Sequence, residues 1–428
     1  MSFQHFNRLV ALLSAAVALL DAGGAEAQPP PNSARFARVV IDDLAESNSH
    51  KPKVLARFSK DGFNDLGSLD SHGFKLYRYV DHWKAYTIFQ PGDPGGFEDA
   101  VVADINGDGW NDIILGGWGN RTIWAENPAG QGLDPYTHSW RVHVVDSTRF
   151  SHELCAADLN HDGRCDIVTT SGLYFQGATP DAWTFVNIGR SGQGTQVGNV
   201  LANDDGYNDV IAVYQSGGTN QIAWFENPGH TGGDPVHSHW SIHVIDSNPG
   251  GTTGANRDMD ELAFAFGDIN GDGRPDLVAA SMGEGPDPGD DNRQVGDGLV
   301  WYEAPANPRT GSWHKHVIDP AVAWVHASSL QLADFAGDGH RSICYAEQDQ
   351  SSHRKDGRPS RQLGILYNVK GDGSKWKMQV LSQYPDFGAG GFNSRVGIIG
   401  RDRLPSIFTS LHGYFGDPNP LLLWRSAE

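Results

Sequence analysis

The sequence is poor in cysteine and contains no apolar run long enough to span a membrane. Its cysteines are Cys155, Cys165 and Cys344, an odd number without the CxxC spacing of a metal site, so at least one is unpaired or bonds another chain. Cys155 and Cys165 flank one turn, and whether they pair is left open. The sequence also lacks a nucleophile elbow, a P-loop, a dinucleotide fingerprint and an HExxH motif. The common signatures of hydrolases, nucleotide-binding enzymes and zinc proteases are therefore absent.

Positive charge is scarce as well. The sequence has 32 Lys and Arg residues and 52 Asp and Glu residues, which gives a net charge of −20. No basic stripe or patch interrupts this acidic balance, so nucleic acid is not an expected partner. Glycine is abundant instead, with 53 residues, and there are 13 Trp residues. This composition favours an all-β protein with many turns.

The first 27 residues are typical of a secretory signal peptide. Arg8 precedes the apolar segment 9–20, and Ala25-Glu26-Ala27 forms a cleavage site of the A-x-A kind. We therefore expect residues 1–27 to be a signal peptide and residues 28–428 to form a single domain. The expected location is secreted or periplasmic, where free calcium is plentiful, and no membrane span is predicted.

A nine-residue acidic turn occurs three times, at residues 104–112, 158–166 and 268–276. Each copy has oxygen-bearing side chains at positions one, three, five and nine and Gly at position six, which is the pattern of a Ca²⁺ loop with a sharp turn. Position seven would contribute its backbone carbonyl. The predicted calcium ligands are Asp104, Asn106, Asp108, Trp110 and Asp112; Asp158, Asn160, Asp162, Arg164 and Asp166; and Asp268, Asn270, Asp272, Arg274 and Asp276.

These loops differ from an EF-hand in the residues after the turn. Position twelve holds Leu115, Thr169 or Ala279 where an EF-hand needs a bidentate Glu. Aliphatic and β-branched runs such as Ile113-Ile114-Leu115 come after each loop and favour a strand. The loop is therefore predicted to be a hairpin turn between two buried strands, closed by a structural Ca²⁺ ion.

The turn belongs to a longer repeat of four predicted antiparallel strands, the plan of a propeller blade. The third strand ends in an aromatic signature such as Trp124-Ala125-Glu126-Asn127-Pro128, and the fourth carries a recurring His at 143, 243 and 316, for which a blade-packing role is expected. Seven such units can be counted, with degenerate turns in several of them. Residues 36–42 match a fourth strand, whereas the last unit ends after its third strand at residues 421–424. The sequence thus predicts a seven-bladed β-propeller that the N-terminal strand closes into a ring.

The turn at 104–112 and its copies, together with Trp124-x-Glu126-Asn127-Pro128 and Trp140-x-x-His143, resemble the FG-GAP or VCBS repeats of secreted β-propellers. Over almost the whole of residues 28–428 the chain resembles the propeller domain of fungal aldos-2-ulose dehydratases, and it is also similar to propeller-type polysaccharide lyases. The cupin domains of the dehydratases have no counterpart here. The repeat motif is specific for fold and calcium, and it carries little information about activity.

Residues just before the inner strands should converge on the propeller axis, at the face opposite the calcium turns. Blade by blade these are His50 and Lys51, Glu98 and Asp99, His152 and Glu153, Gln193 and Thr195, Asp260 and Glu261, His326, and Asn393 and Arg395. His50, His152 and His326 could share Zn²⁺ or another divalent metal, or serve acid–base catalysis. The alternative is that these are ordinary polar residues at the mouth of a wet channel.

A second set of loops on the same face adds aromatic and charged residues suited to a sugar-binding cleft: Trp118, Tyr174, Tyr214, His412 and Tyr414. We assign Trp118, Tyr214, Asp260 and Tyr414 to substrate binding, with exposed loop residues of no function as the alternative. Tyr174 or His412 would act as base or acid, and Lys51 or Arg395 would supply positive charge.

The resemblance implies a carbohydrate-active lyase or dehydratase that works by β-elimination on a keto-sugar or a uronate-containing glycan. The base would remove a proton beside a carbonyl or carboxylate while water or a glycosyl oxygen leaves. The alternative is a non-catalytic propeller that binds glycans or mediates adhesion, with calcium purely structural. The sequence does not indicate an oligomeric state.

Overall fold

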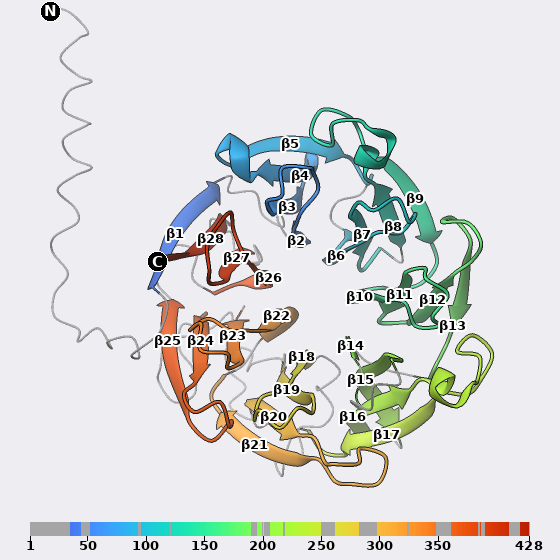
Figure 1. The fold of residues 1–428 in the computed structure, drawn as a ribbon, viewed down its shortest axis with the longest axis vertical. Coiled ribbons are helices and arrows are strands. Elements are labelled where there is room, and N and C mark those ends of the chain that lie inside the picture. The colour runs from blue at the N-terminus through green and yellow to red at the C-terminus, as the bar shows by residue number, and fades with distance from the viewer. Residues whose placement is uncertain are drawn as a thin grey trace, which may run out of the picture.

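The computed structural model describes residues 35–43, 52–92, 96–119, 121–189, 195–198, 200, 206–216, 219–249, 262–281, 298–322, 325–347, 361–383, 386, 390–410 and 420–427. These residues form seven four-stranded antiparallel sheets arranged as blades around a central axis (Figure 1). The predicted seven-bladed all-β propeller is thereby confirmed. None of the helices in the described ranges has the length and hydropathy needed to span a bilayer. The predicted signal peptide, residues 1–27, lies outside these ranges.

Each blade runs from an inner strand at the axis to an outer strand at the rim. Blade 1 contains β2 (Lys53–Ala56), β3 (Asp65–Asp70), β4 (Gly73–Arg78) and β5 (Lys84–Phe89); blade 2, β6 (Asp99–Ala103), β7 (Asp112–Gly116), β8 (Thr122–Glu126) and β9 (Arg141–Asp146); blade 3, β10 (Leu154–Ala157), β11 (Asp166–Thr169), β12 (Gly172–Gln176) and β13 (Trp183–Val186). Blade 4 contains β14 (Thr195–Gly198), β15 (Asp209–Ser216), β16 (Thr219–Glu226) and β17 (Ser241–Asp246); blade 5, β18 (Leu262–Gly267), β19 (Asp276–Ser281), β20 (Leu299–Glu303) and β21 (His314–Asp319). Blade 6 contains β22 (Val325–Ala333), β23 (Ser342–Glu347), β24 (Leu363–Asn368) and β25 (Trp376–Ser382); blade 7, β26 (Phe392–Gly397), β27 (Ser406–Ser410), β28 (Leu421–Ala427) and β1 (Arg35–Asp42). Among the described residues, the short 3₁₀ helices η1 (Tyr79–Asp81), η3 (Pro128–Gln131) and η4 (Pro228–Thr231) come after third strands.

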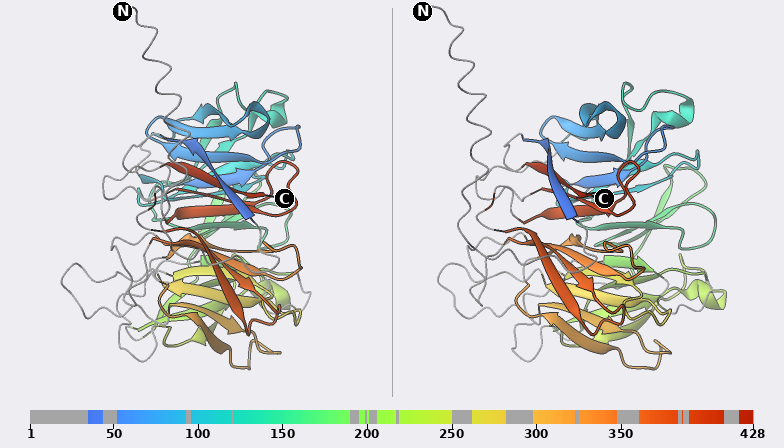
Figure 2. Two further views of the ribbon diagram at one scale, coloured as in Figure 1. Left: turned by 90° about the vertical axis from the view of Figure 1, so that its left-hand side faces the viewer. Right: turned by 60° about the vertical axis from the view of Figure 1, so that its left-hand side comes forward.

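The N-terminal strand closes the ring, as the repeat phase predicts. Strand β1 pairs antiparallel with β28, from Arg35 opposite Ala427 to Val40 opposite Leu422, and becomes the outer strand of blade 7. Both ends of the described chain therefore meet in one sheet, which Figures 1 and 2 show at the same side of the molecule. This pairing covers what would otherwise be an open sheet edge.

Hydrogen bonds from side-chain amides join neighbouring blades. The Asn127 side chain in blade 2 donates to the backbone carbonyl of Phe58 in blade 1 at 3.1 Å. Equivalent bonds run between other blades, from Gln176 to Ile105 at 2.8 Å, from Asn227 to Leu159 at 2.8 Å and from Asn368 to Ile269 at 2.7 Å. The Asn-Pro signature of the repeat thus has a structural role, because it satisfies a buried carbonyl of the preceding blade.

The recurring histidines of the outer strands pack as expected. The imidazole of His143 stacks on Trp124 with ring centroids 4.0 Å apart, and those of His243 and His316 stack on Trp224 and Trp301 at 4.2 Å. In each blade the Nε2 atom of the His faces the Glu two residues after the Trp, at 2.9–3.2 Å. All three cysteines are free thiols, so Cys155 and Cys165 do not pair.

Candidate functional site

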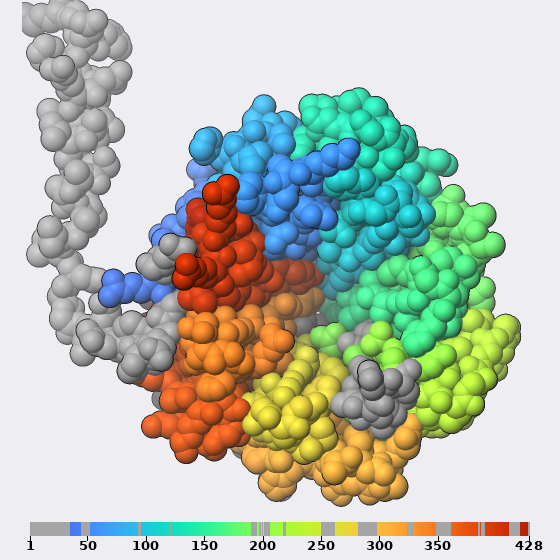
Figure 3. Space-filling model, in the orientation of Figure 1, coloured from blue at the N-terminus to red at the C-terminus, as the bar shows by residue number. Residues whose placement is uncertain are grey.

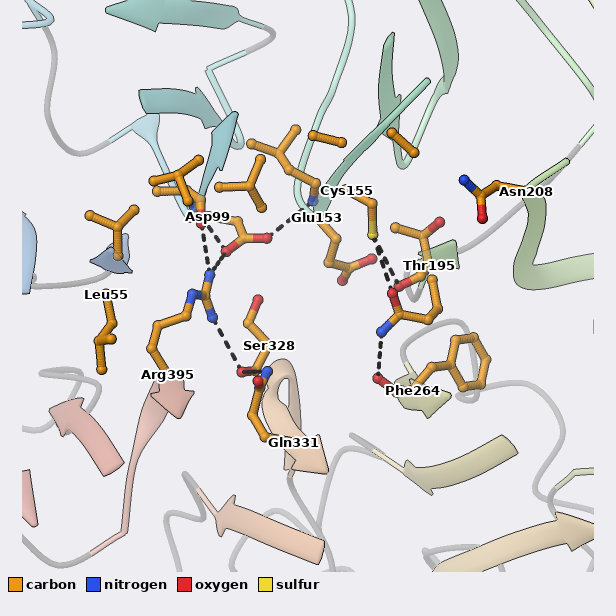
Figure 4. A pocket seen from close by; sticks show the side chains of 18 residues that line it. Leu55, Asp99, Glu153, Cys155, Thr195, Asn208, Phe264, Ser328, Gln331 and Arg395 are labelled. Atoms are coloured by element: carbon orange, nitrogen blue, oxygen red, sulfur yellow. Dashed lines mark hydrogen bonds and ion pairs between the residues drawn. The ribbon is translucent and has the colours of Figure 1, made fainter. Parts of the chain in front are cut away.

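The inner strands of the blades enclose a cavity on the propeller axis of about 520 Å³. The blades occupy adjoining sectors around this axis (Figure 3), and the cavity is lined from every blade, with Asp99, Glu153, Cys155, Thr195, Gln196, Gln331 and Arg395 among its polar residues (Figure 4). Its polar end lies opposite the acidic turns. In β6, Asp99 pairs with Gly116, whereas Ala103, at the other end of the strand, pairs with Asp112 of the turn.

A buried ion pair on the wall of the cavity joins blade 7 to blade 2. The Arg395 guanidinium donates through Nη2 to the Asp99 carboxylate and to the Ala100 carbonyl, and through Nη1 to the Ser328 carbonyl at 3.3 Å. Asp99 is only 2% exposed, and its other oxygen accepts from the backbone N–H of Leu154 at 3.1 Å. Arg395, predicted from its place before an inner strand, therefore does face the axis.

A bulge in β26 directs Arg395 inward. The pairing with β27 shifts register between Phe392 and Arg395, and Asn393 within this segment has a positive φ of 48°. The side-chain amide of Asn393 donates to the carbonyl of Glu98 in blade 2. A bulge re-aims side chains locally, and a left-handed Asn costs about 1 kcal/mol unless its surroundings hold it. Here the contact across the ring holds it.

Lys53 is a buried member of this cluster that was not among the residues predicted from the sequence. Its ammonium donates to the Phe392 carbonyl at 2.8 Å, and the residue is 0% exposed. Burial lowers the pKa of Lys53 well below its usual value, and the positive charge of Arg395 lowers it further, while Asp99 and Glu98 act in the opposite direction. Lys53 opens an inner strand two residues after the predicted Lys51, and that position was the only sequence signal for it.

His152 lies beside the cavity and next to Glu153. Its Nδ1 atom is 3.2 Å from Oε1 of Glu153, and the two residues are 2% and 4% exposed. The imidazole packs edge-on against Trp118 and lies nearly parallel to the ring of Phe150. Two carboxylates, Asp99 and Glu153, and the Arg395 guanidinium therefore line the cavity, with the His152 imidazole next to Glu153.

Two of the other predicted site residues, Tyr174 and Tyr214, do not join this group. Tyr174 is buried between blades 2 and 3, where its hydroxyl donates to Asp146 at 3.0 Å and burial raises its pKa. Tyr214 packs edge-on against Phe225 within blade 4. Five predicted residues lie outside the described residues, namely His50, Lys51, Asp260, His412 and Tyr414, and His326 lies in β22 with its side chain outside them. The shared axial metal stays a prediction.

The acidic turns bring oxygen atoms together. In the first turn the backbone N–H of Asp108 donates both to Asp104, at 3.0 Å, and to Asn106, at 3.1 Å, so these side chains converge. The position-six glycine, Gly109, has a φ of 88°, as the sharp turn requires. Among the described residues no group of three or more His, Cys, Asp and Glu side chains is arranged to hold a metal ion. The donor set, two carboxylates with an amide oxygen, nonetheless suits Ca²⁺ chemically, so the ion remains a proposal.

The carboxylate at position nine of each acidic turn also accepts backbone hydrogen bonds. Asp112 is fully buried and accepts from the backbone N–H of Ile105 at 2.9 Å and from that of Asn127 at 2.8 Å. Burial, together with the nearby carboxylates of Asp108 and Asp104, raises the pKa of Asp112 to about 7, although its two backbone hydrogen bonds act in the opposite direction. The pKa values of the equivalent Asp166 and Asp276 are raised by burial to about 7 and about 6. These aspartates tie each turn to the end of the third strand.

Comparison with known protein families places an FG-GAP-like repeat at residues 58–115, 104–169 and 202–279, and an FG-GAP repeat at residues 262–302. No curated protein matches the chain significantly in sequence. Among solved structures, BBS1N in complex with ARL6DN has a TM-score of 0.53 at 11% identity, covering 93% of this chain and 98% of that one. A lectin of Agrocybe aegerita that recognises non-reducing terminal N-acetylglucosamine has a TM-score of 0.49 at 13% identity, covering 86% and 92%. At 11% identity the likeness to the BBS1N structure concerns the fold alone.

Proposed function

Because the chain is a seven-bladed β-propeller with FG-GAP repeats, we propose that its axial cavity is the active site of a secreted or periplasmic carbon–oxygen lyase that acts on a carbohydrate. The substrate would be a keto-sugar or a uronate-containing glycan. The observation that carries the proposal is that a buried carboxylate, Glu153, and a fixed guanidinium, Arg395, line the wall of the same cavity. A fold alone does not imply an activity, so the proposal depends on this site.

Elimination needs a base and a fixed positive charge, and the cavity offers both. Glu153 would take the proton from the carbon beside a carbonyl or carboxylate group. The C–H electrons then form the C=C bond as the C–O bond breaks, and the leaving oxygen takes up the proton that Glu153 received. Arg395 would stabilise the negative charge that develops on the enolate oxygen. Asp99 would act as a positioning residue, because it holds the guanidinium in place.

His152 and the predicted metal ions would have supporting roles. His152 would orient Glu153 through the contact at Nδ1. If a divalent metal such as Zn²⁺ binds at the axis, His152, with His50 and His326, would hold it, and it would supply additional positive charge. Structural Ca²⁺ in the acidic turns would stabilise the opposite face.

The test is to screen keto-sugars and uronate polysaccharides for the absorbance of unsaturated products, with metal analysis of the purified protein. We expect the Glu153→Gln variant to lose about 100-fold or more in kcat, which is the scale of general base catalysis. The control is Glu303→Gln, a half-exposed carboxylate on the third strand of blade 5. Absence of product from every substrate, or full activity of Glu153→Gln, would contradict the proposal.

One observation favours the second candidate, a calcium-stabilised propeller that binds glycans or mediates adhesion without catalysis. Both Nη atoms of Arg395 already donate to protein acceptors, namely Asp99 and the carbonyls of Ala100, Ser328 and Ser394. Such an ion pair could serve only to join blades 2, 6 and 7. Saccharide binding without turnover, unchanged in Glu153→Gln, would support this candidate.

A further inference from the structure

Trp118 differs from every other described aromatic residue in its exposure. It is 53% exposed, whereas the other Phe, Tyr and Trp side chains of the described ranges are buried or half-buried. Trp118 lies in the turn between β7 and β8, on the same face as Asp99 and Glu153. Single exposed apolar side chains are common on protein surfaces, but Trp118 combines its exposure with a fixed setting close to the cavity.

The backbone on both sides of Trp118 is fixed. The N–H of Gly119 donates to the Gly96 carbonyl at 3.0 Å, and the carbonyl of Gly117 accepts from the N–H of Ser151 at 3.3 Å. A Cβ atom on Gly117 would lie 2.2 Å from the Gly96 carbonyl oxygen, so the close approach requires glycine. The turn is thereby fastened to both loops that lead into the inner strands β6 and β10.

Other side chains support the Trp118 ring. Its centroid lies 4.8 Å from that of Phe150 and 4.9 Å from that of His152. The imidazole of His152 is in turn 3.2 Å from Glu153, which lines the cavity. The exposed ring is therefore a preorganised surface one side chain away from the proposed active site, and a ligand would lose little free energy in ordering it.

We propose that Trp118 is a stacking platform for an uncharged sugar ring of the saccharide whose reacting part enters the axial cavity. The apolar C–H face of a pyranose matches an aromatic ring, while its hydroxyl groups remain in water. Charge argues against a polyanionic glycan, because two carboxylates, Asp99 and Glu153, and one guanidinium, Arg395, face the cavity, and the whole chain carries −20. This inference rests on the proposed function and chooses the neutral keto-sugar class over the uronate class.

The test measures binding directly, by isothermal titration of the full protein with cellotriose and maltotriose as neutral probes and trigalacturonate as the anionic probe. We expect a neutral probe to bind more tightly than trigalacturonate. Trp118→Ala should weaken neutral binding about tenfold or more, and Trp118→Phe should retain part of it. The control is Leu133→Ala, which removes an exposed apolar side chain, 41% exposed, from the face of the acidic turns.

The outcomes separate this inference from the proposed function. Tight binding of a neutral probe that survives Glu153→Gln and is lost in Trp118→Ala supports the platform, whether or not turnover is found. Neutral binding equal in Trp118→Ala and the parent overturns it, as does preferred binding of trigalacturonate or no binding of either neutral probe. Loss of product formation in Glu153→Gln alone bears on the elimination chemistry and not on the platform.

Discussion

At the scale of single residues, the buried aspartates that begin the second strands are the most informative. In blade 1, where the turn is degenerate, Asp65 occupies the equivalent place and is 0% exposed. One of its oxygens accepts from the backbone N–H of Tyr79 at 2.8 Å, and the other accepts from the Tyr136 hydroxyl. Burial raises the pKa of Asp65 to about 6, although both hydrogen bonds lower it. Ionisation of the Asp65 carboxylate therefore destabilises the folded state, and the free energy of unfolding depends on pH for this reason.

We expect Asp65→Asn to remove part of the pH dependence of stability. The folded pKa lies above the unfolded value, so between about pH 4 and 6 the folded state binds more protons and the free energy of unfolding falls as pH rises. This loss amounts to roughly 2–3 kcal/mol in the parent. Urea unfolding at pH 4, 5, 6 and 7 measures it, with the exposed Asp372→Asn as control.

The variant should therefore gain stability relative to the parent as pH rises through this interval and show no further relative change above about pH 6 to 7. A variant that loses stability relative to the parent as pH rises, or parallel curves for the two proteins, would show that the pKa of Asp65 is not raised in the folded state. Asp372→Asn should leave the parent's slope unchanged.

At the scale of the element, local sequence predicts the blades well because each blade is built from local pairings. The acidic turns, the strands beside them and the Trp–His stacks all depend on residues within one repeat. Local sequence does not predict where the Tyr174 side chain lies, because alternation along a strand does not reveal whether a side chain faces the axis or the neighbouring blade. Local sequence predicts the burial of Lys53 even less, since the ammonium of Lys53 bonds the Phe392 carbonyl, 339 residues away in the sequence.

The acidic turns should make the stability of the protein depend on calcium. A ligand that binds only the folded state adds RT ln(1 + [L]/Kd), about 2.7 kcal/mol per site at a hundredfold excess over Kd. Chelator should lower the melting temperature of the parent, and Asp108→Ala, Asp162→Ala and Asp272→Ala should each lose part of that response. Thermal melts with and without added Ca²⁺ measure the effect.

Asp234→Ala provides a matched control. Asp234 accepts from the N–H two residues on, Val236, at 2.9 Å, just as Asp108 accepts from Trp110 at 3.0 Å, but Asp234 belongs to no predicted calcium turn. Its variant should keep the full response to chelator. A parent melt unchanged by chelator, once metal analysis shows that calcium has gone, would rule out a stabilising role.

At the scale of the whole molecule, the candidate site exists only because the ring is closed. Arg395 in blade 7 meets Asp99 in blade 2, and Lys53 in blade 1 meets Phe392 in blade 7. These contacts join residues from opposite ends of the chain, so no local pattern could predict them. Strand β1 joins blade 7 to both of its neighbours, since Asp42 accepts from the Tyr77 hydroxyl of blade 1 at 2.7 Å and Phe36 packs on Phe335 of blade 6.

Deletion of residues 28–43 should therefore destabilise the whole propeller. It removes the outer strand of blade 7, exposes the edge of β28 and breaks the contacts of Asp42 and Phe36 with the neighbouring blades. An exposed edge also invites pairing with other chains, so we expect a melting temperature several degrees lower together with aggregation, measured by thermal melts and light scattering. The control deletes residues 28–34 and stops just before β1, and it should behave as the parent does. If the longer deletion is as soluble and as stable as the control, closure by β1 contributes nothing to stability, and the site across blades 7, 1 and 2 must be held by the inner strands alone.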